Sequence, residues 1–190
     1  MMNLSLKKNW SNIVLLIIIL VVLIPQTRMP VQVFLQRIIS VSPSIIAEEQ
    51  RERITNFSWE LTNLNGDHVN FYEAEGKVVF VNIWATWCPP CIAELPSLQK
   101  LYDSYGQDVS FYFVTREDPD VVHAFLQKKG FSLPVFIEKQ NAPKLLETQT
   151  LPTSYLISKQ GEIIIKKVGV ANWNHENVRK IIDELLVSSH

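Results

Sequence analysis

Apolar residues are arranged in two different ways along this chain. Near the amino terminus they form one unbroken run from Ile13 to Ile24. From Phe57 onward, short apolar runs alternate with segments in which apolar residues recur every three or four positions. The alternation predicts an α/β domain, and the amino-terminal run predicts a separate apolar helix in front of it.

The flanks of the apolar run are typical of a membrane signal. Lys7 and Lys8 precede the run, and Pro25 ends it. Its twelve residues cover about 18 Å as a helix, against a hydrocarbon core of roughly 30 Å, so length alone favours a signal peptide. The cleavage pattern favours an anchor, because the nearest small-x-small triplet, Ser40-Val41-Ser42, lies far downstream.

We therefore predict an uncleaved signal anchor over residues 1–28, in contact with the lipid bilayer through residues 13–24. The lysines of such an anchor stay in the cytoplasm, so the chain after Pro25 is expected on the extracytoplasmic, periplasmic side of the membrane. Residues 29–54 would then form a juxtamembrane segment and a linker.

The juxtamembrane segment has apolar residues at helical spacing, and these are Val31, Phe34, Leu35 and Ile38. The spacing predicts a short amphipathic helix. Such a helix lies on the outer membrane face, or it packs against the domain or against a partner. Pro43 interrupts the pattern, and the charged stretch Glu48–Arg53 is expected to be a solvated linker.

Residues 55–190 contain several strand patterns. Val78–Trp84 is almost continuously apolar, as expected for a central strand that is covered on both faces. The other predicted strands are Val109–Thr115, Pro134–Glu138, Ser154–Ser158 and Glu162–Val168, the last two joined as a hairpin.

Helix patterns alternate with these strands. Asp118-Pro119 has the form of a helix N-cap and first residue, and Gly130 marks the end of that helix. Its predicted buried stripe consists of Val121, Val122, Phe125 and Leu126. The other predicted helices are Ile92–Tyr105, a short piece near Pro143–Glu147, and His175–Val187. Together, the pattern predicts an α/β fold with three layers around a mixed sheet.

Composition and charge narrow the possible functions. The 190 residues include 47% hydrophobic and 19% charged residues, which excludes a disordered chain. With 18 Lys and Arg against 19 Asp and Glu, the chain lacks the basic excess of a nucleic-acid-binding protein. Its only two cysteines are Cys88 and Cys91, so a scaffold held together by several disulfides is also excluded.

The two cysteines lie where a buried strand passes into a helix. A thiolate of Cys88 at that helix N-terminus would be stabilised by free backbone N–H groups and by the helix dipole, so its pKa should lie below about 8.5. Pro89 and Pro90 stiffen the loop without loss of a hydrogen bond.

Other interpretations of the pair are an inert disulfide or two small buried apolar residues. Structural zinc needs four ligands, and no second cysteine pair is present, so we predict no metal site. Covalent haem attachment needs a histidine after Cys91, where the chain has Ile92.

The run from Val79 to Cys91 (VFVNIWATWCPPC) resembles the active-site segment of the thioredoxin superfamily. Glu94-Leu95-Pro96 resembles more narrowly the membrane-anchored TlpA/ResA branch of bacterial thiol–disulfide oxidoreductases. Leu151-Pro152-Thr153 is similar to the cis-proline loop of that family. The resemblance covers about residues 55–187 and implies a thioredoxin-like fold.

The resemblance implies a role for each matching residue. Cys88 is expected to be the attacking nucleophile and Cys91 the resolving cysteine, which together form a redox-active disulfide. Pro152 is expected to be cis, and Leu151 to offer backbone groups to an extended substrate. The predicted substrate-binding residues are Trp87, Pro89, Pro90, Leu151, Pro152 and Thr153.

Glu94 follows Cys91 by three residues, so the two side chains can share one face of a helix. The branch that the chain resembles has a glutamate at this position, which adjusts the pKa values of the two cysteines. If Glu94 is partly buried, its pKa should be raised, and it should relay a proton to or from Cys91. The alternative is a solvated glutamate in the first helical turn. Asn82 occupies the place of the buried aspartate of thioredoxin, which makes Glu94 more important.

The resemblance implies an extracytoplasmic thiol–disulfide oxidoreductase that needs no organic or metal cofactor and acts as a reductant rather than an oxidant. Its expected partners are protein disulfides, for example apocytochrome c, and a membrane electron donor that restores the dithiol. No nucleic-acid partner is expected. The alternatives are a disulfide-forming oxidant and a non-catalytic membrane-anchored binding module.

Overall fold

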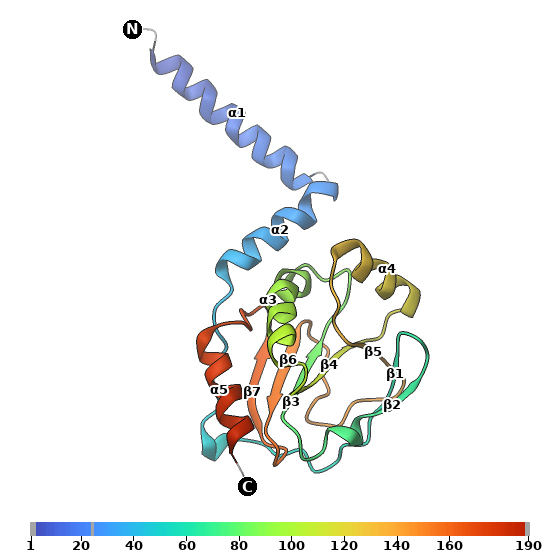
Figure 1. Ribbon diagram of the computed structural model, residues 1–190. Coiled ribbons are helices and arrows are strands. Elements are labelled where there is room, and N and C mark those ends of the chain that lie inside the picture. Colours follow the sequence, from blue (N-terminus) through green and yellow to red (C-terminus); the bar gives the residue numbers. More distant parts are fainter. Residues whose placement is uncertain (1–2, 24, 189–190) are drawn as a thin grey trace.

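Two helices precede the α/β domain in the computed structural model, which describes residues 3–23 and 25–188. They are α1 (Asn3–Leu23) and α2 (Pro25–Ile39). In Figure 1, α1 extends away from the domain and α2 lies beside it. Ile24, the last residue of the predicted apolar run, lies outside the described residues. Within those residues, no helix combines the length and the apolar character needed to cross a bilayer.

The domain is built on a mixed sheet of seven strands in the order β2-β1-β5-β4-β3-β6-β7. At its centre, β3 runs parallel to β4 and antiparallel to β6, which confirms the prediction of a mixed sheet. The strands are β1 (Glu60–Asn63), β2 (His68–Asn70), β3 (Val79–Ile83), β4 (Ser110–Thr115), β5 (Val135–Glu138), β6 (Thr153–Ile157) and β7 (Ile163–Val168).

Three helices of the domain pack on one face of this sheet. They are α3 (Pro89–Tyr105), α4 (Pro119–Lys129) and α5 (Glu176–Val187), and Figure 1 shows α3 and α5 side by side. Because side chains alternate along a strand, Phe80 of β3 joins this helical side of the core, whereas Val79 and Val81 point to the other side.

The second face of the sheet is covered mainly by irregular chain. Residues 54–59 and the 3-10 helix η2 (Phe71–Ala74) pack there, together with Leu146; a second 3-10 helix, η1 (Glu48–Gln50), lies in the linker. The helix predicted near residues 143–147 is only one turn, in which the N–H groups of Leu146 and Glu147 both donate to the carbonyl of Pro143.

Local capping signals set the limits of α4. Asp118 is the N-cap, and its side chain accepts a hydrogen bond from the N–H of Asp120 at 2.8 Å. Gly130 ends the helix with a φ of 70°, a conformation that glycine adopts without strain. The prediction of the helix is confirmed, but that of its buried stripe is partly wrong, because Val121 is 51% exposed.

The amphipathic helix predicted from Val31 to Ile38 is confirmed as part of α2. Of the positions considered for its apolar face, the structure contradicts packing against the domain. Phe34, Leu35 and Ile38 are exposed. The domain is contacted instead by the other side of the helix, where the Arg37 Nε donates to the carbonyl oxygen of Ala93 in α3 at 3.3 Å. The apolar face of α2 is therefore open to solvent in the isolated chain.

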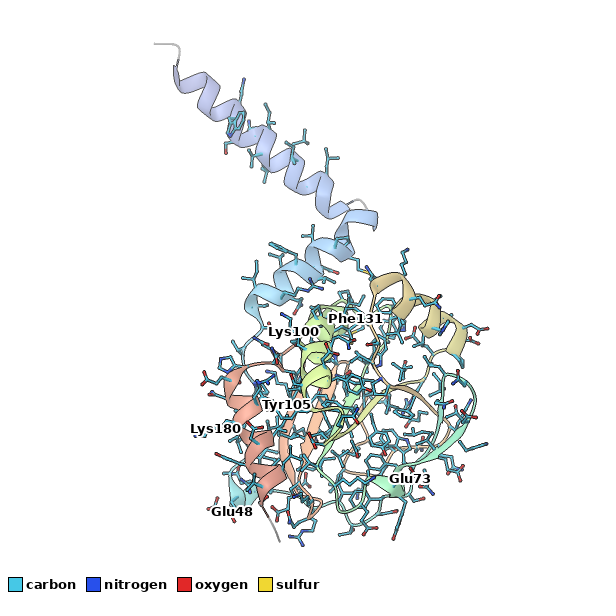
Figure 2. All side chains as sticks on the ribbon, in the orientation of Figure 1. Glu48, Glu73, Lys100, Tyr105, Phe131 and Lys180 are labelled. Atoms are coloured by element: carbon cyan, nitrogen blue, oxygen red, sulfur yellow. A yellow bond between two sulfur atoms is a disulfide. The ribbon has the colours of Figure 1, made fainter. Side chains whose placement is uncertain are left out.

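The carboxyl end of α3 is fixed against α5. Tyr105 donates from its hydroxyl to Asp183 Oδ1 at 2.8 Å, and the Arg179 guanidinium lies over the tyrosine ring at 5.1 Å from its centre. Figure 2 shows Tyr105 between the two helices. These contacts hold the helix that begins at the cysteine pair.

Candidate active site

The two cysteines form a disulfide at the start of α3, with their Cα atoms 5.3 Å apart. The chain reaches this point directly from the central strand β3, as the sequence predicts. Cys88 retains 4% exposure, whereas Cys91 is fully buried. Of the two cysteines, only Cys88 therefore retains surface that a substrate can reach.

Cys88 is the N-cap of α3. Its backbone is extended, and its Sγ accepts a hydrogen bond from the N–H of Cys91 at 3.3 Å. Pro89 and Pro90 occupy the first positions of the helix, where the missing N–H groups would have no helical partner. A sulfur in this position lies where the helix terminus stabilises negative charge.

The loop that leads to Cys88 is held by Glu117, which follows β4. Its carboxylate accepts hydrogen bonds from the Thr86 N–H at 2.6 Å and from the Thr86 hydroxyl at 2.7 Å. Sequence reasoning missed this residue. The signal was available, because parallel strands such as β3 and β4 bring the residues after their carboxyl ends to the same edge of the sheet.

The peptide bond between Leu151 and Pro152 is cis. Ile83, at the end of β3, pairs with Thr153, at the start of β6, so the proline loop and the cysteine loop lie at the same end of adjacent strands. Thr153 is fully buried, and its hydroxyl donates to the carbonyl of Thr150 at 2.7 Å. Its side chain therefore supports the loop from inside.

Glu94 is buried one turn after Cys91 and is only 1% exposed, so the alternative of a solvated glutamate is wrong. Its Oε1 accepts a hydrogen bond from the Asn82 side-chain amide at 2.8 Å. Its Oε2 accepts from the Trp173 indole N–H at 3.2 Å and from the Ala171 N–H at 3.3 Å. Sequence reasoning singled out Asn82 and Glu94 separately, but not their direct contact, and it missed Trp173.

Burial raises the pKa of Glu94 from 4.5 to about 8, because an ionised carboxylate is poorly solvated there. The hydrogen bonds from Asn82, Trp173 and Ala171, and the charge of Lys167, favour the ionised form and lower the pKa, but they do not outweigh burial. The carboxyl group therefore exchanges a proton near neutral pH.

The remaining predicted residues surround this centre. Trp87 is 63% exposed and Leu151 is half-buried; both line one cavity of about 340 Å³. Pro89 and Pro90 are half-buried beside α2. Trp84 is buried and packs against Phe125, with ring centres 5.8 Å apart. Over the described part of the chain, no group of three His, Cys, Asp or Glu side chains is arranged to hold a metal ion.

Comparison with known proteins relates this geometry to a family. The model of the AhpC/TSA family matches residues 52–166. Thiol-disulfide oxidoreductase ResA of Halalkalibacterium halodurans is 36% identical over 135 residues, which is 70% of this chain and 74% of that protein. ResA of Geobacillus kaustophilus is 31% identical over 128 residues, or 66% of this chain and 72% of that protein.

Solved structures share the fold. The crystal structure of a DsbF homologue from Corynebacterium diphtheriae has a TM-score of 0.59 and 21% sequence identity to this chain. The match covers 76% of this chain and 93% of that one. The architecture around the disulfide is therefore that of a thioredoxin-like protein.

Proposed function

The chain belongs to the AhpC/TSA family and is a thiol–disulfide oxidoreductase similar to ResA, and we propose that it reduces disulfides of exported proteins. The reduction would use the Cys88–Cys91 pair. The observation that carries the proposal is the disulfide at the N-terminus of α3, with an exposed edge only at Cys88. The cis-proline loop at the same end of the sheet supports it.

In the proposed reaction, the reduced pair first exists as a Cys88 thiolate and a Cys91 thiol. The thiolate attacks one sulfur of a client disulfide, and the other client sulfur leaves as a thiolate, which takes up a proton. Cys91 then loses its proton and attacks the Cys88 sulfur of the mixed disulfide. The client leaves as a dithiol that has gained two electrons, and the protein, which has lost these two electrons, is left with the Cys88–Cys91 disulfide.

Glu94 is proposed to accept the proton of Cys91 in the second step. It follows Cys91 by one helical turn, and its raised pKa, about 8, suits a group that takes up and releases a proton near neutral pH. The N–H donors of Asn82 and Trp173 keep the carboxyl group in place while its charge changes.

Clients are proposed to bind as extended segments along the loop of Leu151 and Pro152, beside Trp87, Pro89 and Pro90. Exported proteins with oxidised cysteine pairs, including apocytochrome c, are the proposed clients. The oxidised protein would then be restored by a membrane electron donor, since an extracytoplasmic compartment is oxidising.

The direction of electron transfer is tested by the reduction potential of the Cys88–Cys91 pair. We expect a value near that of thioredoxin, about −270 mV, because the protein must deliver electrons. The measurement is a redox titration against glutathione or dithiothreitol buffers, followed by thiol alkylation and mass spectrometry. A value near −120 mV, typical of a strong oxidant, would favour disulfide formation instead.

We also propose that residues 1–28 anchor the protein and that residues 55–190 act outside the cytoplasm, linked through residues 29–54. Two lysines before an apolar run support this orientation. The full chain is then expected to stay with membranes during carbonate extraction, and a chain lacking residues 1–28 to be released. Release of both forms would contradict the anchor.

A further inference from the structure

Helix α2 carries an apolar stripe that the described part of the chain leaves open. The stripe consists of Phe34, Leu35, Ile38 and Ile39, which are between 54% and 66% exposed. Residues four apart on a helix are neighbours on its surface, so these four side chains form one continuous patch. We call this patch the α2 stripe. An apolar patch of this kind is typical of a surface that binds a partner or a membrane.

The α2 stripe is connected to a second exposed apolar surface, that of α1. Helix α1 ends at Leu23 and α2 begins at Pro25, so the two helices are separated by one residue. Figure 1 shows α1 extending away from the domain. Its exposed apolar residues are Ile13, Val14, Leu15, Leu16, Ile17, Ile19 and Leu20. If α1 anchors the chain, as proposed above, α2 therefore begins at the surface of the bilayer.

The charge of this part of the chain favours an anionic bilayer over a second copy of the protein. Residues 1–47 contain four basic residues and no Asp or Glu, and α2 itself includes Arg28 and Arg37. Helices with an apolar side and basic residues bind in the headgroup region of anionic membranes. In a symmetric dimer each surface meets a copy of itself, so the arginines of α2 would face arginines.

The α2 stripe also borders the cysteine loop. Leu35 and Ile39 line a hollow of about 350 Å³ together with Pro89 and Pro90, the two residues that follow Cys88. The hydrogen bond from Arg37 to the carbonyl of Ala93 holds α2 against the same end of α3. A surface that covers the α2 stripe is therefore next to the loop that begins at Cys88.

We propose that the α2 stripe lies in the headgroup region of an anionic bilayer and that α2 thereby holds the Cys88 loop beside the membrane surface. The inference rests on the proposed anchor and on the proposed disulfide reduction. It adds to them the place where the reaction occurs. Protein disulfides and electron donors with reactive cysteines close to the bilayer would then reach Cys88 in preference to those far from it.

Photo-crosslinking identifies what covers the stripe. The full chain, with p-benzoylphenylalanine in place of Phe34, is reconstituted into vesicles of phosphatidylcholine and phosphatidylglycerol and irradiated. We expect lipid adducts at position 34, detected by mass spectrometry. The matched control has the same substitution at Tyr72, which is 59% exposed and next to Glu73, far from α2 in Figure 2, and should give no lipid adduct. Covalent dimers without lipid adducts at position 34 would overturn the inference.

The position of Cys88 is tested with two maleimides on the reduced full chain in the same vesicles. One is attached to the headgroup of phosphatidylethanolamine, and the other is soluble N-ethylmaleimide. Their ratio of rates at Cys88 reports closeness to the bilayer, because a nearby headgroup reagent has a high effective concentration. The soluble reagent corrects for the reactivity of the thiol itself.

Ile38→Glu should lower this ratio about tenfold, because a carboxylate in the α2 stripe weakens its binding to an anionic bilayer. The matched control is Val187→Glu, which changes an 83% exposed apolar residue at the end of α5 and should leave the ratio unchanged. Figure 1 shows this end of α5 far from α2.

The failures can be told apart. If the chain stays with the vesicles but position 34 gives no lipid adduct, or Ile38→Glu leaves the ratio unchanged, the inference is overturned and the anchor stands. If the chain does not stay with the vesicles, both the anchor and the inference fail. Reduction of a soluble peptide disulfide is measured separately, and its absence would overturn the proposed function.

Discussion

Cys88→Ser is expected to reduce client disulfide turnover to the uncatalysed rate, and Cys91→Ser is expected to trap a client as a covalent adduct on Cys88. Cys88 is the cysteine with exposed surface, and it caps the N-terminus of α3, so its replacement removes the thiolate that we propose as the attacking group. We expect a loss of about 10³-fold or more, since a serine hydroxyl is not ionised at neutral pH. Cys91 is fully buried, and in the proposed reaction it acts only after the mixed disulfide has formed.

The measurement combines an insulin or peptide reduction assay with mass spectrometry of the adduct under non-reducing conditions. Thermal unfolding of both variants controls for folding. Both substitutions remove the same disulfide at the start of α3, so a difference between the variants in activity cannot come from loss of the disulfide alone. An adduct that forms on Cys91 in Cys88→Ser, and not on Cys88 in Cys91→Ser, would reverse the assigned order of attack. If Cys88→Ser leaves the biological function of the protein intact although disulfide turnover is lost, the protein acts as a binding module and not as an oxidoreductase.

Glu94→Gln is expected to remove most of the pH dependence of stability between about pH 5 and pH 8. The folded protein holds the Glu94 proton up to a pKa of about 8, whereas the unfolded chain releases it near 4.5. Between these values the folded state binds more protons, so its stability falls as pH rises, by up to about 1.4 kcal/mol per pH unit. The decrease is complete above the folded pKa.

The free energy of unfolding is measured by urea titration of the oxidised protein, in which neither cysteine titrates. The free energy of unfolding of Glu94→Gln minus that of the parent should rise by several kcal/mol from pH 5 to pH 8, because only the parent loses stability, and should then stay constant. Glu73→Gln, which changes an exposed carboxylate in the same way, should show no such growth. A constant difference between Glu94→Gln and the parent would show that Glu94 ionises normally.

The same substitution should slow the resolving step. With a pKa of about 8, only about a tenth of Glu94 is ionised at pH 7, and this fraction rises with pH. Release of a client from its mixed disulfide should therefore accelerate toward pH 8 in the parent. In Glu94→Gln we expect client release to be about 10²-fold slower at pH 8, because the substitution removes the general base. Unchanged release would exclude a proton relay through Glu94.

The sequence predicted those parts of the fold that have local causes. The N-cap Asp118, the following Pro119 and the terminal Gly130 act within their own helix, so α4 could be located without any tertiary contact. The central strand β3 was recognised because burial on both faces leaves a continuous apolar run. The hairpin of β1 and β2 was missed, since strands of four and three residues are too short for a clear alternation.

Features that depend on tertiary packing could not be predicted in this way. Helical spacing identified α2, but it does not determine which side of the helix packs against the domain. Phe34 is exposed, so the apolar side of α2 does not pack there. Glu94 was placed beside Cys91 by spacing within one helix. Its partners Asn82 and Trp173 come from β3 and from the segment before α5, so only the folded chain brings them together.

The most direct test of the account is the pKa of the Cys88 thiol in the reduced protein. It is measured from the pH dependence of iodoacetamide alkylation, with mass spectrometry to separate modification of Cys88 from that of Cys91. We predict that Cys88 reacts first, with an apparent pKa below the value of about 8.5 of a free cysteine, because its sulfur caps a helix N-terminus. A pKa at or above that value, or a Cys88 that reacts no faster than Cys91, would contradict the assignment.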